Sequence, residues 1–214
     1  MRDAVEHVTG QAEPAPAGRS GLARACGGAG FAVWAVGASG LVAYLMALHA
    51  VPLPPAAGAP VHPTLAVMQT GRKVWRAIHV LAEGCPCSAA VADDLVNRGP
   101  AVGLDEAVYV AGGDGNDLER RLTGRGFRVR RVTSDLLLSG FAIRGAPWLV
   151  VVDPDDRVAY SGGYAAERPG AGVELQDLSI IRRLRAGQRV APLPAFGCAI
   201  DPALRRAMDP LGLR

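Results

Sequence analysis

Charged residues are missing from a long stretch of this sequence: positions 25–71 contain no Asp, Glu, Lys or Arg, although these residues make up 20% of the chain. A uniform soluble domain would rarely leave such a gap. Cysteine is also scarce, and 4 cysteines in 214 residues exclude a disulfide-dense scaffold. A net charge of +3, without a basic stripe interleaved with aromatics, argues against a nucleic-acid partner. Because 50% of the residues are hydrophobic, a disordered chain is excluded as well.

The first part of the uncharged stretch is apolar enough to cross a membrane. Residues 29–51 read AGFAVWAVGASGLVAYLMALHAV. At about 1.5 Å per residue, a helix of this length measures roughly 34 Å, against ~30 Å for the hydrocarbon core. Arg19 and Arg24 precede the segment and no positive charge follows before Arg72, so the positive-inside rule keeps the N-terminus in the cytoplasm and exports the rest. We interpret the segment as an uncleaved anchor, because the apolar region of a cleaved signal peptide is shorter and begins earlier.

Prolines dominate the second part of the uncharged stretch, which reads PLPPAAGAPVHP from Pro52 to Pro63. Such a composition favours an extended, semi-rigid tether. The residues after it are enough for one domain of ordinary size. The predicted organisation is a short cytoplasmic tail over 1–24, a transmembrane anchor over 25–51, a tether over 52–71 and one exported domain over 72–214.

Strand and helix signals alternate through the exported domain. Apolar runs predict strands, amphipathic stretches predict helices, and Asp153-Pro154-Asp155-Asp156 predicts a hairpin turn between the last two strands. The order of these elements predicts an α/β fold, with a mixed central sheet and helices on both faces. The expected strands are 74–81, 107–111, 127–132, 148–152 and 157–160, and the expected helices are 89–97, 116–122, a short one from Ser134, and 176–186.

The motif Gly84-Cys85-Pro86-Cys87-Ser88 lies where the first strand is expected to turn into a helix. A cysteine just before a helix experiences the positive end of the helix dipole and unpaired backbone N–H groups, and both lower the pKa of its thiol. Pro86 suits the first helical position, where its missing N–H costs nothing. We therefore expect a reactive thiolate at Cys85, with Cys87 close enough to pair with it or to act as a second metal ligand.

A second motif, Gly145-Ala146-Pro147-Trp148, precedes the apolar run WLVVV. A proline at the start of a buried strand cannot donate to the strand ladder, so it requires an edge position or a special peptide bond. The motif therefore marks a turn with an unusual backbone rather than an ordinary strand.

Together the two motifs resemble the thioredoxin fold, and the chain is similar to membrane-anchored, periplasmic thioredoxin-like proteins of the TlpA type. A narrower resemblance, to RedB-like redox proteins, is carried by Cys-Pro-Cys-Ser, by Gly162-Gly163-Tyr164 and by Phe196-Gly197-Cys198-Ala199. The resemblance implies a protein of the bacterial inner membrane that exchanges thiols and disulfides with periplasmic proteins, without a cofactor. It also implies that Cys85 is the attacking thiolate, that Pro147 is a cis-proline beside the active site, and that Ala146 offers its backbone to an extended substrate.

The motif departs from the usual Cys-x-x-Cys. With Cys85 at the first cysteine, Ser88 takes the place of the second cysteine, and Cys87 lies between them. An alignment on the proline would instead put Cys87 at the resolving position and a residue other than cysteine at the first; we prefer the former, because Cys85 then precedes the helix. Three arrangements stay open: a strained Cys85–Cys87 disulfide, Cys198 returning as the resolving thiol, or monothiol chemistry with Ser88 donating a hydrogen bond to Cys85.

Two other functions compete with thiol–disulfide exchange. Cys85, Cys87 and Cys198, with His79 or His62, are suitable ligands for Cu(I) or Zn(II), so a metal-binding or metal-delivery module is the first alternative. His79 lies in the first expected strand, where a hydrogen-bonded core role is the more ordinary interpretation of a histidine. The second alternative is a non-catalytic, thioredoxin-like interaction domain in which a Cys87–Cys198 bond is structural.

Overall fold

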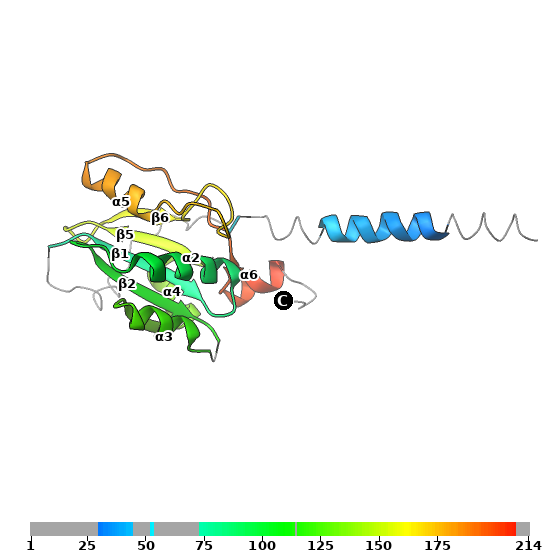
Figure 1. Cartoon of the computed structure of the whole chain (residues 1–214), viewed down its shortest axis with the longest axis horizontal. Coiled ribbons are helices and arrows are strands. Elements are labelled where there is room, and N and C mark those ends of the chain that lie inside the picture. The colour runs from blue at the N-terminus through cyan, green and yellow to red at the C-terminus, as the bar shows by residue number, and fades with distance from the viewer. Residues whose placement is uncertain (1–29, 45–51, 54–72, 114, 209–214) are drawn as a thin grey trace, which may run out of the picture. The chain divides into compact units, whose positions relative to one another are not determined.

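The chain divides into two compact units, Met1–Met46 and Ala47–Arg214, which we describe separately. The computed structural model describes residues 30–44, 52–53, 73–113 and 115–208 (Figure 1).

A single α-helix over residues 30–44 is the described part of the first unit. Its apolar side chains are exposed, with Phe31 at 68%, Trp34 at 67% and Leu41 at 58%. Within the described residues, no helix is both long enough and apolar enough to cross a membrane. The predicted anchor extends beyond this helix at both ends, and the predicted tail over 1–24 lies outside the described residues.

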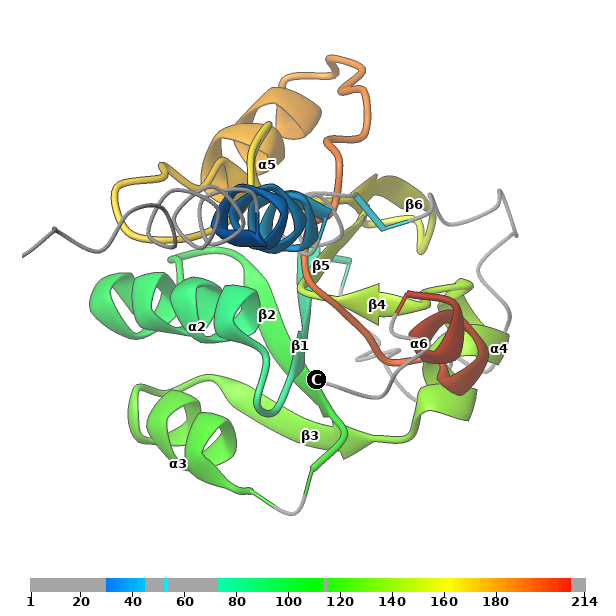
Figure 2. The same ribbon diagram turned by 90° about the vertical axis from the view of Figure 1, so that its right-hand side faces the viewer.

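A five-stranded mixed sheet forms the centre of the second unit, in the order β3-β2-β1-β5-β6 (Figures 1 and 2). The β1–β2 and β2–β3 pairs are parallel, whereas the β1–β5 and β5–β6 pairs are antiparallel. Because β1 has a strand on each side and is covered on both faces, all of its residues are buried, as its apolar sequence requires. The strands are β1 (Arg76–Ala82), β2 (Asp105–Ala111), β3 (Arg128–Val132), β5 (Trp148–Val152) and β6 (Val158–Gly162).

Helices cover both faces of this sheet, as the sequence predicted. Leu95 of α2, Leu122 of α3 and Ile180 of α5 belong to one apolar cluster, whereas Leu137 of α4 belongs to the cluster on the other face. Figure 2 shows the same division of the helices. Such a mixed α/β arrangement is consistent with a thioredoxin-like fold. The helices are α2 (Pro86–Arg98), α3 (Asp117–Gly124), α4 (Ser134–Phe141), α5 (Asp177–Arg185) and α6 (Pro202–Met208).

Local sequence signals account for the ends of α2 and for the last hairpin. Helix α2 begins at Pro86, earlier than the predicted 89, and ends at Arg98. The residue after it is Gly99, whose φ of 70° is in the left-handed region that glycine tolerates. The β5–β6 hairpin is confirmed. Its turn is held by Asp153, whose carboxylate accepts hydrogen bonds from the backbone N–H groups of Asp155 and Arg157, each at 2.9 Å.

Three short elements were not predicted. Strand β4 (Gly145–Ala146) pairs antiparallel with β7 (Cys198–Ala199), and α6 follows β7. Two residues are too few for a periodic pattern, so neither strand leaves a signal in the sequence. Leu53, at the start of the predicted tether, forms a bridge with Ala195 and is buried in the core of the second unit. The rest of the tether, 54–71, lies outside the described residues.

Candidate active site

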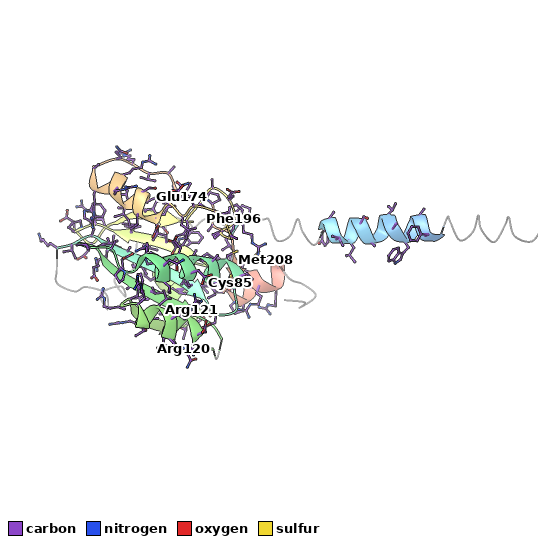
Figure 3. The ribbon with its side chains drawn as sticks, in the orientation of Figure 1. Cys85, Arg120, Arg121, Glu174, Phe196 and Met208 are labelled. Carbon is purple, nitrogen blue, oxygen red and sulfur yellow. The ribbon has the colours of Figure 1, made fainter. Side chains whose placement is uncertain are left out.

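Cys85 caps the N-terminus of α2, at the carboxyl end of β1 (Figure 3). Its backbone is extended, with φ −92° and ψ 118°, and its carbonyl oxygen accepts the first helical hydrogen bond from Ala89 N at 2.9 Å. Pro86 occupies the first helical turn, as expected. The sulfur therefore lies where the helix dipole and the free N–H groups favour a negative charge. Cys85 is only 3% exposed, which was not foreseen.

Hydrogen bonds from neighbouring groups hold the pKa of Cys85 far below the usual range of a thiol. The Cys198 thiol contributes most and the Cys87 thiol next. Burial opposes ionisation, but the backbone N–H and the hydroxyl of Ser88 also stabilise the thiolate. The Ser88 hydroxyl is itself positioned by accepting a hydrogen bond from the backbone of Ala82 at 3.0 Å. Cys198 and Ser88 both lie beside the Cys85 sulfur, and the three arrangements left open above stay predictions.

The pKa values of the other two thiols shift in the opposite direction. Hydrogen bonding to Cys85 raises the pKa values of both Cys87 and Cys198, and burial raises them further. Cys85 is therefore the thiol of the three that ionises most readily. All three are free cysteines in the structure. Arg168 adds a positive charge: its Nε donates to Cys87 Sγ at 3.2 Å. Sequence reasoning missed Arg168, because it lies in an irregular loop far from the motif.

Cys198 reaches this site through the short β4–β7 pair. In that pair Cys198 lies opposite Ala146, and the following Ala146–Pro147 bond is cis, as the resemblance implied. Gly197 makes the close approach possible, because a Cβ there would overlap the carbonyl oxygen of Ala146. The backbone of Ala146, expected to be available to an extended substrate, is instead paired with the chain's own Cys198. The Ala146 carbonyl oxygen also lies 3.5 Å from Cys85 Sγ.

A cavity of about 620 Å³ opens beside Cys198, at the carboxyl ends of the parallel strands. Its walls are mostly polar, and Arg131 and Glu83 form an ion pair there with N and O 3.7 Å apart. Of the three described thiols, only that of Cys198 is on its wall. The charged and hydroxyl residues of the wall are Glu83, Arg131, Thr133, Ser134 and Arg205.

His79 does not join the thiols. Neighbouring residues of β1 alternate between the two faces of the sheet, and the ring of His79 packs against Phe127 and Tyr164 in the cluster opposite Cys85 and Cys87. Its Nδ1 lies 3.1 Å from the Tyr164 hydroxyl. His79 therefore has the core role of a buried, hydrogen-bonded histidine. His62, the other histidine considered as a ligand, lies outside the described residues.

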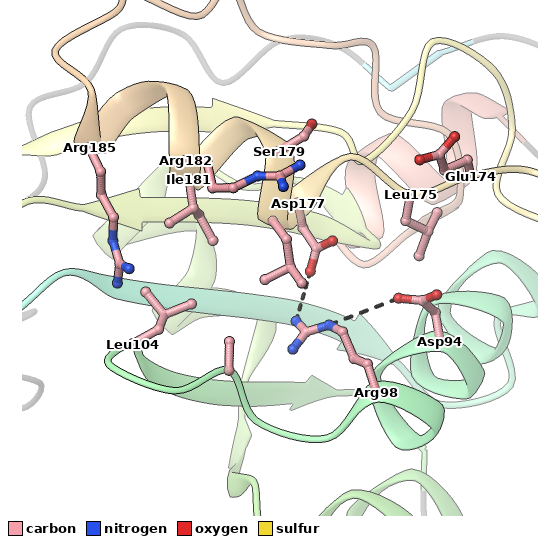
Figure 4. Close-up of a pocket in the computed structure, with 12 residues that line it drawn as sticks. Asp94, Arg98, Leu104, Glu174, Leu175, Asp177, Ser179, Ile181, Arg182 and Arg185 are labelled. Atoms are coloured by element: carbon pink, nitrogen blue, oxygen red, sulfur yellow. Dashed lines mark hydrogen bonds and ion pairs between the residues drawn. The ribbon is translucent and has the colours of Figure 1, made fainter.

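His79 belongs to a buried polar cluster centred on Glu106. Its Nε2 lies 3.1 Å from Glu106 Oε1, which also accepts a hydrogen bond from Arg98 at 2.6 Å. Burial raises the pKa of Glu106, but hydrogen bonds from His79 and Arg98 outweigh it and lower that pKa to about 2. Arg98 also donates to Asp177 at 2.7 Å and so ties α2 to α5 beside a second cavity of about 500 Å³ (Figure 4).

This polar cluster is the one group of potential metal ligands found among the described residues. One ligand atom each of His79, Glu106 and Asp177 lies within 4.8 Å of the others. The guanidinium of Arg98 already bonds to both carboxylates, so a cation occupies the place that a metal would take. The three cysteine sulfurs do not form such a group.

No family model matches the chain, and no curated protein matches it. Similar solved structures include an uncharacterized conserved protein from Geobacillus kaustophilus, with 17% identity, a TM-score of 0.46, and 71% of this chain and 90% of that chain covered. A hypothetical protein from Sinorhizobium meliloti 1021 has 18% identity and a TM-score of 0.46 over 70% of this chain and 93% of its own. A thiol:disulfide interchange protein of the thioredoxin family from Chlorobium tepidum TLS has 16% identity and a TM-score of 0.37 over 62% and 94%. At these scores we draw no conclusion from them about this chain.

Replacing Cys198 with Ala should raise the pKa of Cys85, because the largest stabilising hydrogen bond to its thiolate is lost. Cys198→Ser is the matched control, since its hydroxyl can still donate, and it should raise the pKa by less. The ultraviolet absorbance of the thiolate, followed against pH in the full-length protein, measures both. An unchanged Cys85 pKa in Cys198→Ala contradicts the arrangement described here.

Arg98→Met should destabilise the domain by about 3–5 kcal/mol, because it leaves the Glu106 carboxylate buried without its guanidinium partner. Arg120→Met, which removes an exposed pair with Asp117, should cost at most about 1 kcal/mol. Urea unfolding measures both values. Neither change should alter the pKa of Cys85, because the cluster and the thiols lie on opposite faces of the sheet; a shift in Arg98→Met would show that they are coupled.

Proposed function

We propose that this protein catalyses thiol–disulfide exchange, with the Cys85 thiolate as the attacking group. The observation that carries the proposal is the position of Cys85: it caps the N-terminus of α2, and its sulfur lies 3.5 Å from the carbonyl oxygen of Ala146, the residue that pairs with Cys198. Thiolate is the form of cysteine that attacks disulfides, and its fraction at a given pH is set by the thiol pKa. A structural cysteine in an apolar core would have its pKa raised instead.

The exchange needs a second thiol from the same chain. The Cys85 thiolate attacks a sulfur of a disulfide, the S–S bond breaks, and one substrate sulfur leaves as a thiolate. A second cysteine, Cys198 or Cys87, then loses its proton and attacks the mixed disulfide, which releases the other substrate sulfur. Two electrons pass from the protein dithiol to the substrate, and the reverse sequence oxidises a substrate dithiol. Cys87 is two residues from Cys85, and Cys198 pairs with Ala146, whose carbonyl oxygen lies 3.5 Å from Cys85 Sγ, so both candidate partners are close to that sulfur.

Cys85→Ser should abolish reduction of a disulfide-bonded model protein, insulin, by the full-length chain kept reduced with dithiothreitol. The serine hydroxyl is not ionised at neutral pH and cannot attack a disulfide. Arg120→Met, on an exposed part of α3, is the control and should keep the wild-type rate. Insulin reduction above the rate with dithiothreitol alone is the measurement. A Cys85→Ser protein as active as the wild type would overturn the proposal.

The two competing functions give different results in the same preparation. A metal-delivery module would retain stoichiometric Cu(I) through gel filtration and lose it when Cys85 and Cys87 are both replaced by Ser. A non-catalytic domain would show a permanent Cys87–Cys198 disulfide in peptides prepared without reduction. Either result, together with no insulin reduction, would replace thiol–disulfide exchange as the conclusion.

We also propose that residues 29–51 anchor the protein in the bacterial inner membrane, with the domain over 72–214 in the periplasm and acting on periplasmic proteins. The apolar sequence, the arginines that precede it and the helix over 30–44 with its exposed apolar side chains support this placement. An oxidising compartment suits a cysteine pair that cycles through a disulfide. The tether would keep the thiols within reach of other proteins at the membrane surface.

A carbonate wash of bacterial membranes tests the anchor. The full-length protein should stay in the membrane pellet, whereas a chain with Leu41→Arg and Val42→Arg should be extracted, since charges at the middle of the span oppose insertion. A membrane-impermeant maleimide should label Cys198, the exposed thiol, in intact spheroplasts. Release of the unaltered chain by carbonate, or labelling only after lysis, would contradict the proposed placement.

A further inference from the structure

Burial separates the three thiols of the site into two kinds. Cys85 and Cys87 are each 3% exposed and belong to an apolar cluster, whereas Cys198 is exposed. A thiolate attacks a disulfide through direct contact between sulfurs, so access matters as well as the thiol pKa. The thiol that caps the N-terminus of α2 is therefore not the one that solvent reaches.

The cavity beside the site leads to the same thiol. Its volume of about 620 Å³ is within the usual range for a small-molecule site. Cys198 lines it, together with the charged residues Glu83, Arg131 and Arg205. A disulfide with polar substituents can therefore enter the cavity and keep polar groups around it. A disulfide in this cavity would meet the Cys198 sulfur and not that of Cys85.

Cys198 is held firmly next to Cys85 by the segment around it. Besides the β4–β7 pair, Ile200 N donates to the Arg144 carbonyl oxygen at 2.9 Å, and Arg144 Nε donates to the carboxylate of Asp201 at 2.8 Å. The close approach of Gly197 to Ala146 fixes the strand further. Two sulfurs held in this way react as an intramolecular pair, which raises their effective concentration strongly.

We infer that Cys198 is a catalytic residue that meets the external disulfide first, and that Cys85 then completes the exchange; this inference rests on the proposed function and reverses the order of the two attacks given there. The exposed Cys198 thiol loses its proton to water and attacks one sulfur of the disulfide R–S–S–R. The substrate S–S bond breaks, a Cys198–S–S–R bond forms, and R–S⁻ leaves. The Cys85 thiolate then attacks the Cys198 sulfur and displaces the second R–S⁻, so the products are a Cys85–Cys198 disulfide, two R–S⁻ and the one proton released to water.

Oxidised glutathione is the probe that tests this order in the full-length protein. In Cys85→Ser, a glutathione adduct should accumulate on Cys198, because the thiol that would displace it is missing; a pH of about 8.5, near the pKa of a free thiol, supplies part of Cys198 as thiolate. In Cys198→Ser, reaction of Cys85 should be slower than that of the wild type by roughly 10²-fold, because the buried sulfur lacks the geometry for attack. The wild type should end with a Cys85–Cys198 disulfide. Mass spectrometry of unreduced peptides locates each product.

Gly197→Ala gives a test that leaves all three cysteines in place. The added Cβ must push the β7 strand away from Ala146, so the Cys198 adduct should form while its displacement by Cys85 slows and the adduct accumulates. Circular dichroism checks that each variant is folded.

Two results would overturn the inference, and they are distinguishable. A Cys198→Ser protein that reacts at Cys85 as fast as the wild type refutes the order but leaves the proposed function intact. A wild-type protein in which no cysteine reacts with the probe refutes both.

Discussion

The negative charge on the buried Cys85 sulfur determines the arrangement of the groups around it. A thiolate that is almost completely removed from water requires donors in place of solvent. The start of α2 supplies the helix dipole and a backbone N–H, Ser88 supplies a hydroxyl, and the thiols of Cys87 and Cys198 supply two further donors. Because these donors come from distant parts of the chain, the charge is stable only where the fold brings them together. At the carboxyl end of β1, the segments that complete the fold are therefore also the ones that supply these donors.

The C-terminal segment also contributes to the site at this end of β1, because β7 pairs with β4 there. It reaches Ala146 through β7, and the approach is close enough that only glycine fits at position 197. The same segment contributes Ala195, which pairs with Leu53 and covers the core beside β4. Leu53, Ala195 and Cys85 belong to the same buried apolar cluster, whereas Cys198, on the same C-terminal segment as Ala195, is exposed.

Sequence reasoning located the parts of this site that depend on local signals. A proline after Cys85 marks a helix start, an Asp-rich turn marks a hairpin, and a Gly-x-Pro step marks an unusual backbone; all three are in the structure at the expected places. The position of Arg168 and the pairing of β4 with β7 depend on contacts between segments far apart in sequence, which leave no periodic pattern. The face of the sheet on which His79 lies could not be predicted for a different reason. It follows from the alternation of side chains along β1, which can be applied only once the strand and its register are known.

The identity of residue 88 explains why a third cysteine is needed. The Ser88 hydroxyl accepts from the backbone of Ala82 and donates to Cys85, so it ties the end of β1 to the charged sulfur. A cysteine there would be a weaker donor and acceptor and would form this link less well. With that position used to stabilise the charge, the partner thiol for exchange has to come from elsewhere. Cys87 is buried and bonded to Arg168, whereas Cys198 bonds to the same sulfur and is also open to the cavity. In this site, one part of the chain stabilises the thiolate and another part contacts the substrate. A Cys-x-x-Cys motif would place both functions in one helical turn.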